Sequence, residues 1–226
     1  MSWALVSPLR RVRVAVRRPV AVAPRPAPAA TPAPAETPAQ VPRLRDWIGI
    51  LAMVFGLFMA IMDVQIVTSS LSQIQGGLSA SADEIAWVQT AYLIADVVMV
   101  PMSGMMSRLL STRVLFVAAA LGFTGTSALC ATATSLGQMI VFRAMQGLCG
   151  GAIAPTVWPV VYSKFRGRQL ATVISIISVI LSLSSTVGPT LGGFLTDTFS
   201  WNWLFLVNIV PSLLVAALVA PAHAQG

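Results

Sequence analysis

The chain has 226 residues, of which 56% are hydrophobic and only 9% are charged, and its formal net charge is +7. Its mean hydropathy is +0.82. Soluble domains carry roughly 25% charged residues, so this composition excludes an ordinary soluble domain and favours a protein that crosses a membrane several times. Long apolar runs without period-2 alternation favour helices over a barrel, so we predict an all-α membrane protein.

The positive charge is concentrated in a few segments. A basic tail can bind nucleic acid, but cations grouped between apolar runs are typical of membrane topology, so we predict no nucleic-acid partner. Eight arginines precede the first apolar run: Arg10, Arg11, Arg13, Arg17, Arg18, Arg25, Arg43 and Arg45. Two later clusters consist of Arg108 with Arg113, and of Lys164 with Arg166 and Arg168. The one remaining arginine, Arg143, lies inside an apolar run.

Residues 1–46 are rich in proline, alanine and arginine. Such a composition cannot bury a core, so we interpret this segment as a disordered basic cytoplasmic tail able to contact anionic lipid head groups. A cleaved signal is the less favoured alternative, because no compact apolar region stands beside the arginines. A transmembrane domain at 47–221 and a short tail at 222–226 complete the predicted organisation.

Six apolar runs are close to the roughly 20 residues that a bilayer requires. Cations precede the first run and separate the second from the third and the fourth from the fifth, whereas the other loops hold only acids or no charge. The positive-inside rule therefore predicts that both termini are cytoplasmic. The predicted spans cover residues 47–70, 85–106, 114–134, 136–162, 170–195 and 203–220.

Asp63 in the first predicted span and Arg143 in the fourth are ionisable groups at hydrocarbon depth. An arginine there costs at least about 3 kcal/mol. At about 1.5 Å of rise per residue, both groups fall in the outer half of the bilayer, so we expect them to pair. The functional interpretation is a proton-linked site, since burial favours a neutral carboxyl group and a guanidinium favours a charged one. A purely structural ion pair is the alternative.

Three further sets of polar or small residues leave two interpretations each. Gln146 lies one turn from Arg143 and either binds substrate or satisfies the arginine. Asp96 in the second span faces either the same cavity or a neighbouring helix. In the fifth span, Gly188, Pro189, Gly192 and Gly193 indicate a bend at a gate, close helix packing, or both.

Other kinds of chemistry have little support. Cys130 and Cys149 lie in apolar runs without metal-ligand spacing, and His223 is the only histidine. No phosphate-binding loop, nucleophile motif or Cys/His cluster occurs. We therefore predict neither an enzyme nor a cofactor, with a proton gradient as the energy source.

Four stretches carry a family resemblance. Residues 62–67 read Met-Asp-Val-Gln-Ile-Val, 143–152 read Arg-Ala-Met-Gln-Gly-Leu-Cys-Gly-Gly-Ala, 188–193 read Gly-Pro-Thr-Leu-Gly-Gly and 201–211 read Trp-Asn-Trp-Leu-Phe-Leu-Val-Asn-Ile-Val-Pro. They resemble the motifs D-x-T-I-V-N-x-A-L-P, R-x-x-Q-G-x-G-x-A, G-P-x-x-G-G and W-R-W-x-F-x-x-N-x-P of the major facilitator superfamily, in particular its fourteen-span drug:proton antiporters. Asn202 stands where that family usually has arginine.

A fifth motif of that family is degenerate in this chain. The loop G-x-x-x-D-R-x-G-R-R, which helps to control the conformational switch in the family, corresponds here to Gly104, Arg108 and Arg113 without the acid or the second glycine. The motif here therefore lacks the carboxylate that the family's ion pairs use.

The resemblance implies one half of a major facilitator fold, with six transmembrane helices as two inverted three-helix repeats. It also implies proton-coupled export of small hydrophobic or cationic compounds across a bacterial inner membrane, with Arg143 in proton coupling. The partners it implies are the lipid bilayer, a small-molecule substrate, a second six-helix half or a homodimer partner, and a periplasmic adaptor.

A second function is the alternative. The facilitator cavity lies between two six-helix halves, and this chain ends after one. The alternative is therefore a truncated half-transporter, a membrane-embedded fragment without transport activity of its own.

Overall fold

The structure is a computed structural model that describes residues 44–219, within the unit that covers residues 39–226. All regular secondary structure in the described range is helical, as predicted. The predicted tails at 1–46 and 222–226 lie outside the described residues, except for the first three residues of one helix. The helices are α1 (Leu44–Ser69), α2 (Leu71–Gly77), α3 (Ala86–Leu110), α4 (Thr112–Ala131), α5 (Leu136–Lys164), α6 (Gly167–Thr198), α7 (Trp203–Leu206) and α8 (Ile209–Val219).

Within residues 44–219, five helices are long and apolar enough to cross a membrane, namely α1, α3, α4, α5 and α6. They correspond to the first five predicted spans. The predicted sixth span corresponds to two shorter helices, α7 and α8, which together cover Trp203–Val219. The chain is therefore a multi-pass helical membrane protein, and its last apolar run is interrupted.

Two turns between helices are tighter than predicted. Only Ser111, with a φ of 63°, separates α3 from α4, so Gly104 and Arg108 lie in α3 and Arg113 lies in α4 rather than in a loop. Gly167, with a φ of 53°, begins α6, and only two residues separate it from the end of α5. Glycine adopts this backbone conformation at little cost, which allows the abrupt reversal.

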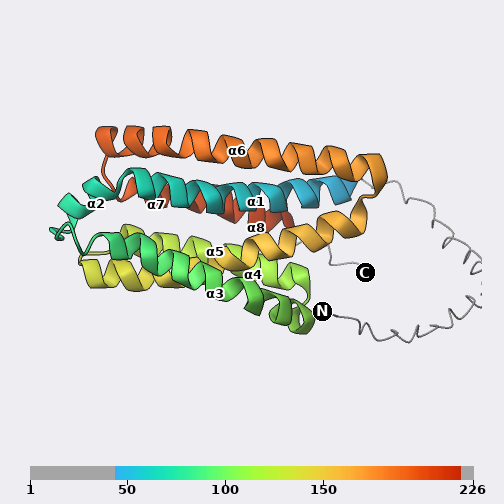
Figure 1. The fold of residues 1–226 in the computed structure, drawn as a ribbon, viewed down its shortest axis with the longest axis horizontal. Helices are drawn as coiled ribbons and strands as arrows, with labels where there is room; N and C mark the ends of the chain where they lie inside the picture. Colours follow the sequence, from blue (N-terminus) through green and yellow to red (C-terminus); the bar gives the residue numbers. More distant parts are fainter. Residues whose placement is uncertain (1–43, 220–226) are drawn as a thin grey trace, which may run out of the picture. The chain divides into compact units, whose positions relative to one another are not determined.

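The helices form two neighbouring groups, α1 with α6 and α3 with α4 and α5, and α8 contacts both groups (Figure 1). On one side α6 packs along α1, and on the other α5 packs against α3 and α4, while α8 packs against both α1 and α4. Buried apolar side chains from these helices form two clusters, one around Phe116 and Val157 and the other around Ile66 and Met139. This arrangement brings the middle of α1 next to the middle of α5.

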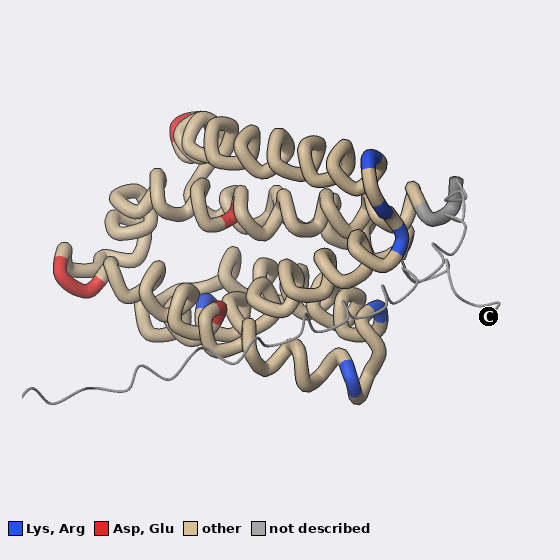
Figure 2. The backbone as a smooth tube through the Cα atoms, turned by 45° about the vertical axis from the view of Figure 1, so that its right-hand side comes forward, with Lys and Arg blue, Asp and Glu red and all other residues tan. Residues whose placement is uncertain are grey.

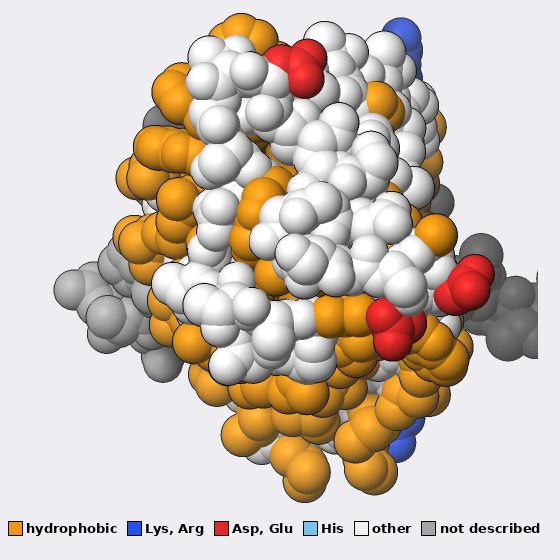
Figure 3. Space-filling view, turned by 90° about the vertical axis from the view of Figure 1, so that its left-hand side faces the viewer, with side chains coloured by type: hydrophobic (Ala, Val, Ile, Leu, Met, Phe, Trp, Pro, Cys, Tyr) orange, Lys and Arg blue, Asp and Glu red, His pale blue; other side chains and the backbone are white. Residues whose placement is uncertain are grey.

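Apart from Asp63, Asp96 and Arg143, the charged residues of the described bundle lie at its two ends (Figure 2). The helix ends and turns at one end carry Arg108, Arg113, Lys164, Arg166 and Arg168, and those at the opposite end carry acids. Figure 3 looks onto the acidic end and shows hydrophobic side chains bordering it on the flanks. Cations at one end and an apolar flank between the ends are what a membrane-spanning bundle requires. The acids are Asp83, Glu84 and Asp197.

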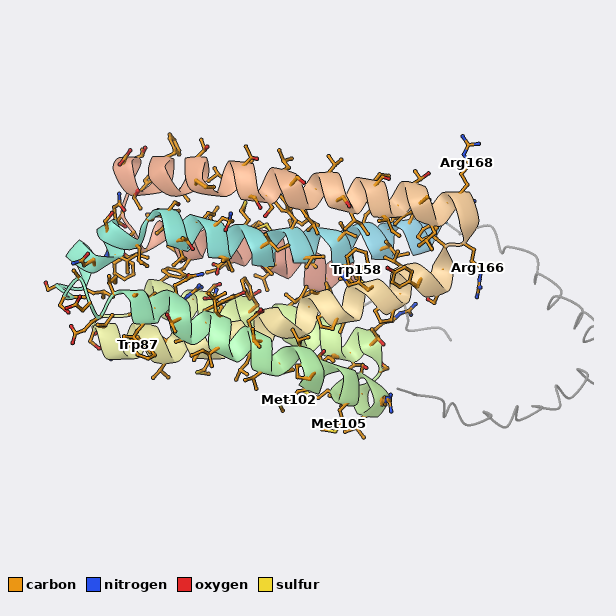
Figure 4. The ribbon with its side chains drawn as sticks, in the orientation of Figure 1. Trp87, Met102, Met105, Trp158, Arg166 and Arg168 are labelled. Carbon is orange, nitrogen blue, oxygen red and sulfur yellow. The ribbon has the colours of Figure 1, made fainter. Side chains whose placement is uncertain are left out.

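α3 presents large apolar side chains on its outer side. Trp87, Met102 and Met105 are 54%, 44% and 62% exposed, and they point away from the bundle (Figure 4). Exposed apolar patches of this kind mark contact with lipid or with another protein. Arg166 and Arg168 project from the turn between α5 and α6 in the same view.

Candidate functional site

An ion pair between α1 and α5 lies at the centre of the bundle. Arg143 Nη1 is 2.7 Å from Asp63 Oδ2, and both side chains are fully buried. The pairing predicted from helix rise is thus present in the structure. Because each charge is removed from water, each depends on the other and on the surrounding hydrogen bonds for its stability.

Two side-chain amides complete the surroundings of the carboxylate. Asn208, in the break between α7 and α8, donates from Nδ2 to Asp63 Oδ1 at 2.6 Å. Gln146 on α5 donates from Nε2 to the same oxygen at a longer 3.4 Å. Each carboxylate oxygen therefore has one short donor, Arg143 for Oδ2 and Asn208 for Oδ1.

The guanidinium is held from two further helices. Arg143 Nη1 donates to Gln146 Oε1 at 2.7 Å, and Nη2 donates to Gln89 Oε1 on α3 at 3.3 Å. The guanidinium carbon lies 4.2 Å from the centre of the Tyr92 ring and 5.9 Å from that of Phe205. Cation–π contact with a buried ring compensates part of the lost hydration of the charge.

Gln146 connects this site to α4. Its Nε2 donates to Ser127 Oγ at 2.6 Å, and the Cys130 thiol donates to its Oε1 at 3.6 Å. Gln146 therefore contacts both members of the ion pair, which supports the interpretation that it satisfies the arginine. The second interpretation, that it binds substrate, stays a prediction.

The glycines that follow Arg143 make room for α3. A Cβ at Gly147 would overlap the Tyr92 backbone carbonyl, and one at Gly150 would overlap the Tyr92 hydroxyl. A Cβ at Gly151 would lie 2.5 Å from the Asp96 carbonyl oxygen. The small residues thus permit the close approach that places the Tyr92 ring over Arg143.

The glycines of α6 do the same for α1. A Cβ at Gly188 would lie 2.6 Å from Gln65 Cβ, and one at Gly192 would lie 2.6 Å from Ser69 Oγ. Gly193 has nothing within 4 Å of an added Cβ, and Pro189 is exposed inside the helix. Close packing is therefore present at two of the four positions, and a bend at a gate stays a prediction.

The remaining predicted site residues lie apart from the ion pair. Asp96 is half-buried on α3, and its side chain makes no hydrogen bond or ion pair with any residue that the structure describes, although its backbone packs against Gly151. Gly104, Arg108 and Arg113 lie at the basic end, in the last turns of α3 and the first turn of α4. The structure does not bring these four residues into the site around Asp63.

Four polar members of the site were not predicted, namely Gln89, Tyr92, Ser127 and Asn208. Each is a polar side chain inside an apolar run, so a complete survey of such residues could have included them. The described residues contain no group of three or more His, Cys, Asp or Glu side chains that could hold a metal ion. Two buried polar atoms of the site, Arg143 Nε and Asn208 Oδ1, have no hydrogen-bond partner within residues 44–219.

Comparison with known proteins gives the family. Residues 53–223 match the family described as the Major Facilitator Superfamily. The chain belongs to this family. The match confirms the predicted resemblance and the predicted class, because this is a family of membrane transporters and not of enzymes.

Two curated relatives illustrate the similarity. The chain is 45% identical over 178 residues to the Colistin resistance protein EmrB of Acinetobacter baumannii, with 79% of this chain and 35% of that protein covered. It is 32% identical over 160 residues to Multidrug resistance protein 3 of Bacillus subtilis, with 71% and 31% covered. The chain thus spans about a third of the length of the curated relatives it matches.

A solved structure supports the fold. The proton:xylose symporter XylE of the same superfamily matches with a TM-score of 0.68 over 78% of this chain and 44% of that chain. The sequence identity is 12%, so the likeness concerns the arrangement of the helices alone.

Proposed function

We propose that this chain forms the amino-terminal six-helix half of a proton-coupled exporter of small hydrophobic or cationic compounds. The observation that carries the proposal is the fully buried Asp63–Arg143 pair between α1 and α5. Ionisable groups inside membrane spans are costly, and they commonly mark proton or substrate pathways.

The proposed fold consists of two inverted three-helix repeats. α1, α3 and α4 form the first repeat, and α5, α6 and the interrupted pair α7–α8 form the second. The ion pair then joins the first helix of one repeat to the first helix of the other, near the middle of the bundle where such transporters bind ions and substrates.

The partners of Arg143 suggest how a proton is exchanged for substrate. When Asp63 takes up a proton, it loses the charge that attracts the guanidinium. Arg143 keeps its hydrogen bonds to Gln146 and Gln89 and its contact with the Tyr92 ring. The arginine is therefore supported in both protonation states of Asp63, while its attraction to α1 changes.

The charge distribution supports an orientation. The end that carries Arg108, Arg113 and the α5–α6 turn would face the cytoplasm, by the positive-inside rule. An even number of spans would then place both termini in the cytoplasm, in the inner membrane of a bacterium, as the bacterial origin of the relatives suggests.

Partners and substrates belong to the same proposal. The relatives named for colistin and multidrug resistance support export of small hydrophobic or cationic compounds. A second six-helix half, from further protein or from a homodimer partner, would complete the cavity, and a periplasmic adaptor would extend the export path.

A second candidate function is a membrane-embedded half-transporter without transport of its own. The observation that favours it is the completeness of the ion pair, since the Asp63–Arg143 contact and its amide partners satisfy both charges without a ligand. In this case the Asp63–Arg143 pair would hold two helices together and would carry no proton.

A flux assay on the purified chain separates these functions. The chain is reconstituted into liposomes with an acidic interior, and uptake of ethidium is followed together with the oligomeric state. Asp63→Asn and Arg143→Ala should abolish uptake, while Asp197→Asn, which removes an exposed carboxylate from α6, should leave it unchanged.

The outcomes differ clearly. Proton-driven uptake that is lost in both site variants and kept in the control supports coupling through the ion pair. Normal uptake in both site variants would contradict a role of Asp63 and Arg143 in proton coupling. A monomeric chain without any uptake would favour the half-transporter.

A further inference from the structure

We infer that Asn208 is a positioning residue for Asp63: its amide, brought to the carboxylate by the break between α7 and α8, stabilises the charged form and so sets the pH at which the site takes up a proton. This inference rests on the proposed function of Asp63 as a proton carrier. Asn208 belongs to the interrupted last apolar run and not to either of the helices that carry the ion pair.

Pro211 favours the break. Pro211 has no backbone N–H, so the carbonyl of Val207 cannot receive the hydrogen bond that a continuous helix would supply. The backbone tightens at this point, since Asn208 N bonds to Phe205 O, three residues back, at 3.2 Å. Helix α8 then starts anew, with Ser212 N bonded to Asn208 O at 3.1 Å.

The break leaves the Asn208 side chain available for Asp63. An asparagine before a helix commonly uses its side-chain oxygen to accept from a backbone N–H in the first turn. Here Oδ1 of Asn208 is buried without a partner, while Nδ2 donates to Asp63 Oδ1 at 2.6 Å. A charged carboxylate only accepts hydrogen bonds, so the amide presents its NH₂ group to it.

Asn208 acts on Asp63 independently of the arginine. Asn208 donates to Oδ1 from the break between α7 and α8, and Arg143 donates to Oδ2 from α5. The titratable or charged side chains that interact with Asp63 in the described structure come from α3, α4 and α5, and none comes from α6, α7 or α8. They are Tyr92, Cys130 and Arg143.

The expected effect follows from the charge on the acceptor. A hydrogen bond to a carboxylate is about twice as strong as one to a neutral carboxylic acid. Loss of the amide therefore weakens the charged form of Asp63 more than its protonated form. The pH at which Asp63 is half protonated should rise by about one unit when Asn208 is replaced by a residue without a donor.

Infrared spectroscopy measures this directly and needs no transport. The purified chain in lipid nanodiscs is titrated, and the carbonyl stretch of the protonated Asp63 carboxyl is isolated by subtracting the spectrum of Asp63→Asn. Asn208→Ala and Asn208→Leu should both move the midpoint upward by about one pH unit. The leucine variant keeps the size of the side chain, so agreement between the two variants excludes an effect of packing alone.

Asn202→Ala is the matched control. Asn202 is the same residue type in the same segment, but it donates from Nδ2 to the Ala131 carbonyl at 2.6 Å and does not contact Asp63. Its loss should leave the midpoint unchanged.

Three results would overturn the role of Asn208. The midpoint could stay unchanged in both Asn208 variants, it could shift in Asn208→Ala alone, or it could shift equally in Asn202→Ala. If Asp63 still titrates normally in the first two of these results, the proposed function stands. An Asp63 that never protonates in the unmodified chain would instead overturn the proton-carrying role, and the role of Asn208 with it.

Discussion

The adjacent glycines of α6 test how closely this helix packs on α1. A Cβ at Gly192 would lie 2.6 Å from Ser69 Oγ, 2.8 Å from Ser70 Oγ and 3.0 Å from Ile66 O, whereas a Cβ at Gly193 meets nothing within 4 Å. Ser70 and Ile66 are fully buried, so they have little room to move away. Alanine at the two positions should therefore change the free energy of unfolding in opposite directions.

The magnitudes follow from two opposing terms. Alanine is a better helix former than glycine by about 0.5–1 kcal/mol, which is the stabilisation expected for Gly193→Ala. Gly192→Ala gains the same helix propensity but overpacks the interface, which costs about 1–3 kcal/mol. The net result at position 192 is a destabilisation of up to about 2.5 kcal/mol.

The assay is reversible unfolding of the purified chain in mixed micelles, by increasing the fraction of sodium dodecyl sulfate and following helical circular dichroism. The two variants differ by one methyl group at neighbouring positions of one helix, so the comparison cancels most other effects. Equal changes in both variants, or a greater loss in Gly193→Ala, would refute the close α1–α6 contact at Gly192.

The same unfolding measurement tests two further features. Removing one member of the Asp63–Arg143 pair should cost about 3–5 kcal/mol, because a buried charge loses its partner, whereas Asp63→Leu combined with Arg143→Met should cost less than either single change. A double variant that costs the sum of the two singles would contradict a coupled pair. Gly147→Ala should destabilise the chain because its Cβ would overlap the Tyr92 carbonyl, while Gly137→Ala on the same helix meets nothing within 4 Å and serves as the control. Similar losses at both glycines would contradict the close contact of α5 with α3.

The sequence was sufficient to predict five membrane-spanning helices but not their ends. Apolar runs report the transfer of side chains into the bilayer, which is what determines whether a segment spans it. Helix ends depend on the backbone instead. The positive φ of Ser111 and of Gly167 produces turns so short that residues expected in loops belong to helices. The break at Asn208 is likewise a local backbone feature, favoured by the missing N–H of Pro211, and a hydropathy pattern does not register it.

Depth explains which part of the site could be predicted. The rise of a helix per residue gave Asp63 and Arg143 a common depth, and the structure joins them. Depth carries no information about which helix faces which, so the contributions of Gln89 and Tyr92 from α3 could not be derived. Asp96 illustrates the converse, because it lies two turns from Gln89 on the same helix, about 10 Å further along, and does not reach the pair.

The two glycine motifs and the ion pair are parts of one arrangement. Gly147 and Gly150 let α3 approach α5, so that Tyr92 covers Arg143, while Gly188 and Gly192 hold α6 against the stretch of α1 that begins at Asp63. α1 is thus joined to α5 by a buried ion pair together with shared apolar clusters, and to α6 by close packing at Gly188 and Gly192. A change in the charge of Asp63 therefore alters one of the contacts between α1 and α5 and none of the close contacts between α1 and α6.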